Sequence, residues 1–186
     1  RRLGIAPDMP LAVYLGVLNR YQGIDLLLSA MVMLKSRGNP LRLLVMGFPE
    51  EKYRQKARDL GIADMVTFTG RIDYGKAPLY LSAGDMAVSP KVSLTEANGK
   101  LFNYMACGLP TIAFDTPVNR EILGETGIYA RYGDAADLAA HLAGLAGDAA
   151  ARAERARLAR ERAEREHSWQ ARADVLEAVY RRMKRA

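Results

Sequence analysis

The sequence is poor in the residues that build disulfide bonds and metal sites. It has one cysteine, Cys107, which excludes an internal disulfide, and two widely separated histidines, His141 and His167, which we expect at the surface. It also lacks a charged-then-apolar leader and any apolar run of the ~20 residues that a membrane-spanning helix needs. We therefore expect a cytoplasmic protein that binds no metal.

Charge is unevenly distributed along the 186 residues. Residues 151–186 hold eleven Lys and Arg against six Asp and Glu, so this segment carries +5 of the overall +6. Such a segment is either a solvated helix face, on which Glu and Arg stabilise one another, or a surface attracted to an anionic membrane or to nucleic acid. The interspersed acidic residues favour the first interpretation. We expect no nucleic-acid partner, and membrane association stays open as an alternative.

Short β-like runs alternate with segments of helical periodicity, and glycines often follow the runs. This alternation predicts an α/β fold, a Rossmann-like parallel sheet with helices on both faces, over residues 1–148. The strands are expected at 11–15, 41–46, 66–69, 86–89, 111–114 and 127–130, and the main helices at 25–36, 50–60, 79–81, 100–107 and 135–145. Ligands bind such sheets beyond the carboxyl ends of the strands, where Gly16, Gly47 and Gly70 fall.

Residues 149–186 are expected to form two C-terminal helices without a strand partner. The first, 149–165, is rich in Ala, Arg and Glu. The second, 169–184, carries an apolar stripe that must dock on something, with Trp169 as its anchor.

The segment from Ser89 to Pro110 carries the chemistry. It leaves a buried strand, passes through a polar loop and opens a helix near Gly99. Unsatisfied backbone N–H groups at a helix start suit a phosphate, Lys100 adds a positive charge, and Glu96 is able to accept hydrogen bonds from sugar hydroxyls. The alternative is that Asn98 merely caps the helix while Lys100 is solvated. Pattern alone leaves the two interpretations even.

The run FNYMACGLPTIA resembles the EAMACGxPVIA signature of family-4 retaining glycosyltransferases of the GT-B fold (glycosyl transferases group 1). The resemblance extends from near residue 3 to the closing helix. It includes LAVYLGVL, LRLLVMG, VTFTGRI, LYLSAGDMAVSP, TPVNREILGETGIYA and HSWQARADVLEAVYRRM. It implies one half of a GT-B fold, the half that binds a nucleotide-diphosphate sugar, without a cofactor. The amino-terminal, acceptor-binding domain is expected to be a partner outside this chain, and the helices of 149–186 are expected to pack back toward it.

Carried over residue by residue, the resemblance implies a donor site built from several loops. The diphosphate would lie over Gly16, the base against the loop at 70–72, and the sugar and phosphates at 96–101. On this resemblance Glu96 and Lys100 take the catalytic roles, stabilising the developing charge of the leaving group. The substrate-binding residues are Gly16, Arg20, Gly70, Arg71, Ile72, Lys91, Thr95, Asn98, Gly99, Leu101 and Asn103.

Several positions depart from the family pattern. The usual arginine after the first glycine is Val17, and the usual lysine before the second is Gln22. The usual paired glutamates fall on Thr95 and Asn103. Candidate replacements for the missing diphosphate-binding charges are Arg20, Lys91 and Lys100.

Three functions follow as hypotheses. The first is retaining glycosyl transfer, with this chain inactive when isolated. The second is a non-catalytic nucleotide-binding or assembly module of the same fold, which the missing glutamates favour. The third, which we regard as least favoured, is nucleic-acid binding by the basic tail.

Overall fold

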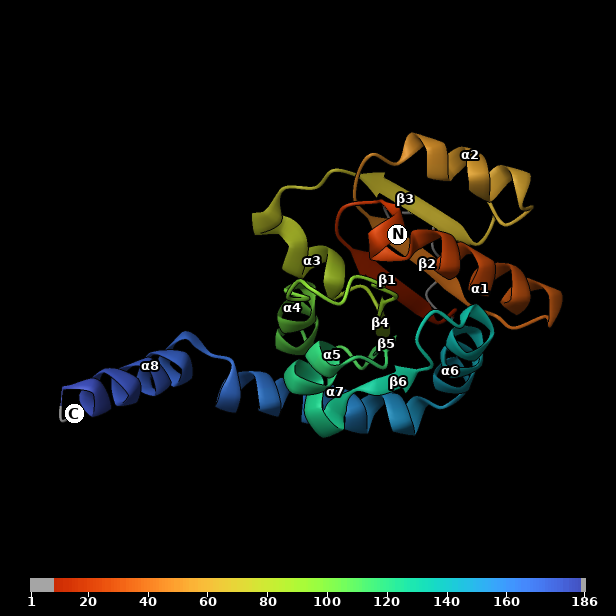
Figure 1. Cartoon of the computed structure of the whole chain (residues 1–186). Helices are drawn as coiled ribbons and strands as arrows, with labels where there is room; N and C mark the ends of the chain where they lie inside the picture. The colour runs from red at the N-terminus through yellow and green to blue at the C-terminus, as the bar shows by residue number, and fades with distance from the viewer. Residues whose placement is uncertain (1–8, 185–186) are drawn as a thin grey trace.

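The computed structural model describes residues 9–184 and shows a six-stranded sheet surrounded by helices (Figure 1). All strand pairs are parallel, and the spatial order is β3-β2-β1-β4-β5-β6. The strands are β1 (Leu11–Leu15), β2 (Arg42–Met46), β3 (Val66–Gly70), β4 (Met86–Ser89), β5 (Thr111–Phe114) and β6 (Ile128–Ala130). The predicted Rossmann-like α/β fold is confirmed.

The helices follow the strands almost as the periodicity predicts. They are α1 (Ile24–Ser36), α2 (Glu51–Asp59), α3 (Ala77–Leu81), α4 (Lys100–Ala106), α5 (Pro117–Leu123), α6 (Ala135–Gly147), α7 (Ala149–Glu166) and α8 (Trp169–Met183). Short 3₁₀ turns, which the periodicity does not indicate, lie at η1 (Arg20–Gln22), η2 (Tyr74–Lys76) and η3 (Gly124–Thr126). Side-chain caps fix several helix starts, since Asp134, Asp148 and Ser168 each accept a hydrogen bond from the first turn of the helix that follows.

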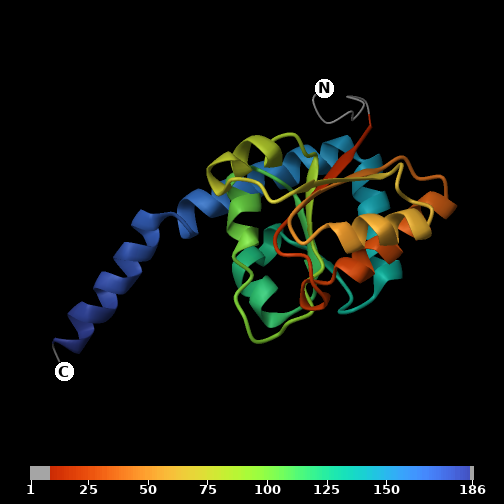
Figure 2. The same ribbon diagram turned by 90° about the horizontal axis from the view of Figure 1, so that it is seen from above.

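Two apolar layers sandwich the sheet, because successive strand residues point to opposite faces. Tyr14 of β1 packs in the layer under α1, α2 and α6, whereas its neighbour Val13 packs in the layer under α3, α4, α5 and α7. Figure 2 shows these helices on both sides of the strands. Because both faces are covered, the strands are nearly continuous apolar runs.

The strand order reverses between β1 and β4. After β1 the chain leads into α1 on one face, and after β4 it leads into α4 on the other. The two strands pair only through Ala12–Met86 and Val13–Ala87, and they diverge beyond these pairs. The hydroxyl of Tyr104 bridges the gap by accepting a hydrogen bond from the Leu15 amide at 2.8 Å and donating one to the Val88 carbonyl. Such a switch point leaves a crevice at the carboxyl ends of the strands.

The two C-terminal helices differ in how they meet the body. α7 packs on α4 through the buried Ala159 and Ala163. Its Arg and Glu side chains form exposed ion pairs such as Arg157 with Glu154 and Glu161, which favours the solvated-face interpretation of the basic segment. α8 instead extends away from the body (Figures 1 and 2) and buries no residue.

Two expectations about this end of the chain are wrong. Trp169 is 93% exposed, so it does not anchor α8 in this structure. His167 is half-buried rather than superficial, with its Nε2 2.9 Å from the Ile122 carbonyl and its ring edge-on to Phe102. The domain boundary at 148/149 stays a prediction. The first eight residues of the chain, which include the start of the family resemblance at residue 3, lie outside the described residues. Within 9–184, no helix is long and apolar enough to cross a bilayer.

Candidate functional site

A cleft of about 530 Å³ lies at the switch point, beyond the carboxyl ends of β1, β2 and β3 and against the start of α4. Four chain segments line it, which the sheet topology brings to one edge. They contribute Leu15, Gly16 and Val17; Met46, Gly47 and Phe48; Arg71, Ile72 and Tyr74; and Gly99, Lys100 and Asn103. Size and position suit a small-molecule ligand.

The bottom of the cleft is main chain packed on main chain. A Cβ atom on Gly47 would lie 1.9 Å from the carbonyl oxygen of Gly16, which leaves no room for any side chain. Gly16 itself has a φ of 147° and donates its amide to the Met46 carbonyl at 3.0 Å. A Cβ there would meet the Lys100 Nζ at 3.1 Å. Both glycines are therefore required by close approach and, at Gly16, by backbone conformation.

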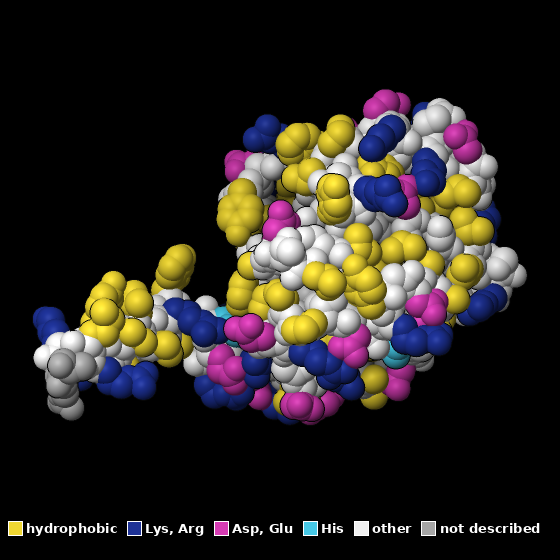
Figure 3. All heavy atoms as spheres, viewed as in Figure 1, with side chains coloured by type: hydrophobic (Ala, Val, Ile, Leu, Met, Phe, Trp, Pro, Cys, Tyr) yellow, Lys and Arg dark blue, Asp and Glu magenta, His cyan; other side chains and the backbone are white. Residues whose placement is uncertain are grey.

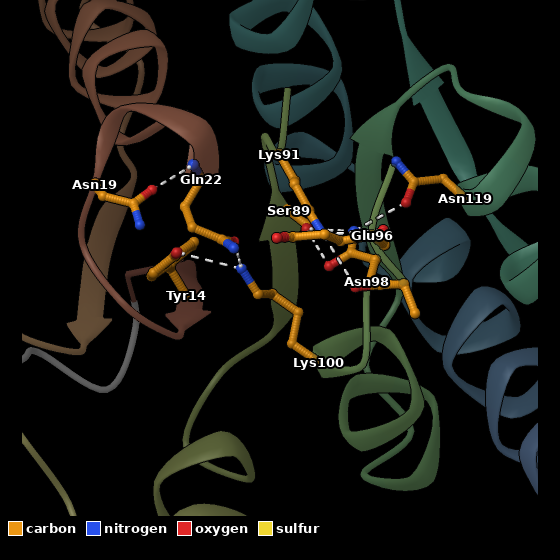
Figure 4. Close-up of polar contacts among 10 residues, drawn as sticks. Tyr14, Asn19, Gln22, Ser89, Lys91, Glu96, Asn98, Lys100 and Asn119 are labelled. Atoms are coloured by element: carbon orange, nitrogen blue, oxygen red, sulfur yellow. Dashed lines mark hydrogen bonds and ion pairs between the residues drawn. The ribbon is translucent and has the colours of Figure 1, made fainter. Parts of the chain in front are cut away.

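Lys100 crosses the cleft from α4 to the loop after β1 (Figure 4). Its Nζ donates to Gln22 Oε1 at 2.5 Å and to the Tyr14 hydroxyl at 3.2 Å, and it lies 4.5 Å from the centre of the Tyr14 ring. Tyr14 in turn donates its hydroxyl proton to the Val17 carbonyl. The alternative in which Lys100 is solvated is therefore wrong: its ammonium group is held beside Gly16 by two neutral oxygens.

The electrostatic surroundings of Lys100 are unusual for a lysine. Burial, and to a lesser extent the positive charge of Lys91, together lower its pKa to about 7. No carboxylate is in contact with this ammonium among the described residues. A buried cation without an anionic partner at the wall of a cleft is an arrangement in which an anionic ligand is stabilised.

The start of α4 has no side-chain cap. The Asn98 side chain turns inward, where its Nδ2 donates to Ser89 Oγ at 2.9 Å and to Asn119 Oδ1 at 2.8 Å. The capping interpretation of Asn98 is therefore wrong. A Cβ on Gly99 would meet no atom within 4 Å, so space is open in front of the helix start. This geometry leaves the first turn of α4 accessible to an anion.

The structure brings six of the thirteen predicted site residues to the cleft and leaves the rest around it. Glu96 is exposed, with its side chain paired to Lys91 at 3.3 Å. The Leu101 side chain is fully buried in the core. Lining the cleft are Gly16, Arg71, Ile72, Gly99, Lys100 and Asn103, while outside its lining lie Arg20, Gly70, Lys91, Thr95, Glu96, Asn98 and Leu101. The roles predicted for these residues stay predictions.

Three aromatic residues at the site escaped the sequence reasoning, two in the lining of the cleft and one beneath it. Tyr74 donates its hydroxyl proton to Asn103 Oδ1 at 3.0 Å. The guanidinium carbon of Arg71 lies 5.1 Å from the centre of the Phe48 ring. Tyr14 lies beneath Lys100. In the sequence, Tyr14 looks the same as any other residue of a buried strand, and no local pattern marks it. Phe48 follows a strand end directly after Gly47, which is a signal that was available for the cleft edge.

Comparison with known proteins identifies the family of this chain. A sequence model of the family described as "Glycosyl transferases group 1" matches residues 9–148. The phosphatidyl-myo-inositol mannosyltransferase of Mycobacterium leprae is 32% identical over 163 residues, which cover 86% of this chain and 42% of that protein. The chain thus spans less than half the length of this curated relative.

Solved structures agree in fold. A sucrose-phosphate synthase from Thermosynechococcus elongatus superimposes with a TM-score of 0.83 at 28% identity, covering 98% of this chain and 47% of that one. Anabaena HepE in complex with UDP superimposes with a TM-score of 0.82 at 17% identity, covering 96% and 50%. With the family model matched over its whole sheet and the cleft at the switch point, the chain belongs to the glycosyl transferases group 1 family.

Proposed function

We propose that this chain is the donor-binding part of a retaining glycosyltransferase, and that the cleft at the switch point holds the diphosphate of a nucleotide sugar. The partner would be an acceptor-binding domain of a longer protein. Support comes from the family membership and from similar folds solved with UDP and with UDP-glucose. In this proposal the bond between the anomeric carbon and the diphosphate oxygen breaks as the acceptor oxygen bonds the anomeric carbon. The nucleoside diphosphate leaves and takes up the proton of the acceptor hydroxyl.

The position of the Lys100 ammonium group carries the proposal. It lies beside Gly16, at the side chain of Gln22, where the family resemblance leads one to expect a lysine. A charge supplied from α4 thus takes the place of charges that the loop after β1 lacks. Together with the uncapped N–H groups of α4, it would stabilise the negative charge that builds up on the leaving diphosphate.

Exchanging the side chains of Lys100 and Gln22 tests whether the ammonium group binds the diphosphate. Lys100→Gln should weaken UDP binding by about 10- to 100-fold, because a hydrogen bond to a charged group contributes roughly 1.5–3 kcal/mol. Adding Gln22→Lys should restore most of the lost affinity, since the ammonium group returns to the same point from the other wall. Isothermal titration calorimetry at pH 6.5 measures both variants.

Lys52→Gln on α2 is the matched control, because Lys52 is exposed and outside the cleft. It should bind UDP as the unmodified chain does. Wild-type affinity in Lys100→Gln would remove Lys100 from the site. If the unmodified chain binds none of UDP, GDP and ADP, the donor site itself is wrong.

A non-catalytic nucleotide-binding module is the second candidate. It is favoured by Asn103, where the resemblance leads one to expect a carboxylate and where the side chain is already bonded to Tyr74. Under this alternative the longer protein would bind a nucleoside diphosphate yet release no sugar. NMR detection of sugar released or transferred from UDP-glucose, GDP-mannose and ADP-glucose separates the two candidates, and the anomeric signal of any product reports retention.

A further inference from the structure

Lys91 lies in the loop between β4 and α4, and its side chain is only 4% exposed. Its Nζ donates to the carbonyl oxygens of Glu96 and Ala97, each at 3.0 Å, and lies 3.3 Å from the Glu96 carboxylate. These three acceptors match the three protons of an ammonium group. The loop is therefore wrapped around the lysine, and no proton of that group is left for a ligand.

A second, uncharged anchor holds the end of the same loop (Figure 4). Asn98 joins Ser89 at the end of β4 to Asn119 of α5, and Asn119 Nδ2 donates to the Phe114 carbonyl at 2.8 Å. Ser89, Asn98 and Asn119 are all at least 98% buried. Buried side-chain networks whose groups are satisfied hold a backbone in one conformation.

The two anchors act on the segment directly before the start of α4. Residues 94–97 between them are exposed, so packing does little to fix this stretch. Gly99 and Lys100 follow immediately after Asn98. The direction of their N–H groups and the origin of the Lys100 side chain therefore depend on these anchors.

We infer that Lys91 and Asn119 are positioning residues, which set the diphosphate-binding start of α4 without touching the ligand. This inference rests on the proposed donor site and assigns to Lys91 a role other than that of a phosphate ligand. Asn119 acts through Asn98, and Lys91 acts through the carbonyl groups of Glu96 and Ala97.

Lys91 has an additional effect that Asn119 lacks, because it carries a charge. Lys100 is faced by the hydroxyl of Tyr14 from β1 and the amide of Gln22 from η1, while Lys91 contributes positive charge from the loop. Glu96, paired with Lys91, is the acidic group of that loop. Removing the Lys91 charge should raise the pKa of Lys100, whereas an uncharged substitution at Asn119 should leave that pKa in place.

The test measures UDP affinity of the 186-residue chain by calorimetry between pH 6.5 and 9. At pH 6.5, Lys91→Met and Asn119→Leu should each bind UDP about tenfold more weakly, the effect of losing roughly 1.4 kcal/mol of positioning. In Lys91→Met the pH above which binding declines should move upward, and in Asn119→Leu it should not. Lys91→Arg, which keeps a cation, should restore the wild-type pH dependence.

Thermal melts show whether each variant is folded at the titration temperature. If Lys91→Met does not fold, Lys91→Gln, which retains a donor without the charge, takes its place with the same two expectations. Lys52→Met is the control for removing a surface charge. Unchanged UDP affinity in the folded Lys91 and Asn119 variants overturns the inference while leaving the donor site intact. A loss of UDP affinity in Lys91→Met without a shift in its pH dependence also overturns the inference. Failure of the unmodified chain to bind UDP, GDP or ADP would instead contradict the proposed function.

Discussion

At the scale of single residues, the buried Lys100 makes the proposed site sensitive to pH. Because the pKa of Lys100 is about 7, its ammonium form is complete only well below this value. A bound diphosphate favours the charged form and raises the pKa. UDP affinity should therefore be constant below the pKa and fall by up to about tenfold per unit as the pH rises above 7. Titrations from pH 7 to 9 measure the decline.

Lys100→Arg is the control for this pH dependence, since a guanidinium group stays charged throughout the range. The affinity of this variant should be flat across the same titrations. A decline that persists in Lys100→Arg would assign the pH dependence to another group and contradict the role of Lys100.

Sequence reasoning at this scale succeeded where the backbone alone decides. Gly16 directly follows a strand, and this position is visible in the sequence. The structure shows that its backbone conformation there favours glycine. The direction of a long side chain is not visible. Lys91 lies in the loop before α4 and Lys100 is the first residue of α4, yet Lys91 points into its own loop and Lys100 points across the cleft. Asn119 lies 21 positions from its partner Asn98, and nothing in its segment indicates a contact with that loop.

At the scale of elements, the C-terminal helices should contribute unequally to stability. Ala159→Leu overfills the interface of α7 with α4 and should lower the free energy of unfolding by about 1–3 kcal/mol. Trp169→Ala removes a side chain that is 93% exposed and should change the free energy of unfolding by less than about 0.5 kcal/mol. Urea denaturation measures both. An equal loss in the two variants would contradict the packing described here.

The alternation of strands and helices could be predicted because buried parallel strands and amphipathic helices leave distinct periodicities. The expected anchoring of Trp169 failed because an apolar stripe predicts burial without naming a partner. Figure 3 shows apolar side chains gathered along α8. Val175, Leu176 and Met183 of this helix are exposed. Within the described residues, nothing covers this stripe.

At the scale of the whole molecule, we expect donor binding and sugar transfer to be separable. The chain spans less than half of the curated mannosyltransferase that it resembles, whereas the cleft is lined by this chain alone. The 186-residue chain should therefore bind a nucleoside diphosphate but transfer no sugar, and the longer protein should do both. Calorimetry and NMR product analysis measure the two activities. Sugar transfer by the 186-residue chain would contradict this division.

The packing of Gly47 against Gly16 limits how such a site is able to diversify. At Gly47 a side chain would collide with the Gly16 carbonyl group, so it requires the main chain to move. At Gly16 a side chain would meet Lys100, and the φ of 147° there favours glycine. Side chains that project at the rim, such as Phe48, Arg71 and Tyr74, are free of this constraint. If the cleft is the donor site proposed above, a related protein that accepts a different nucleotide should differ in its rim residues and keep the same floor.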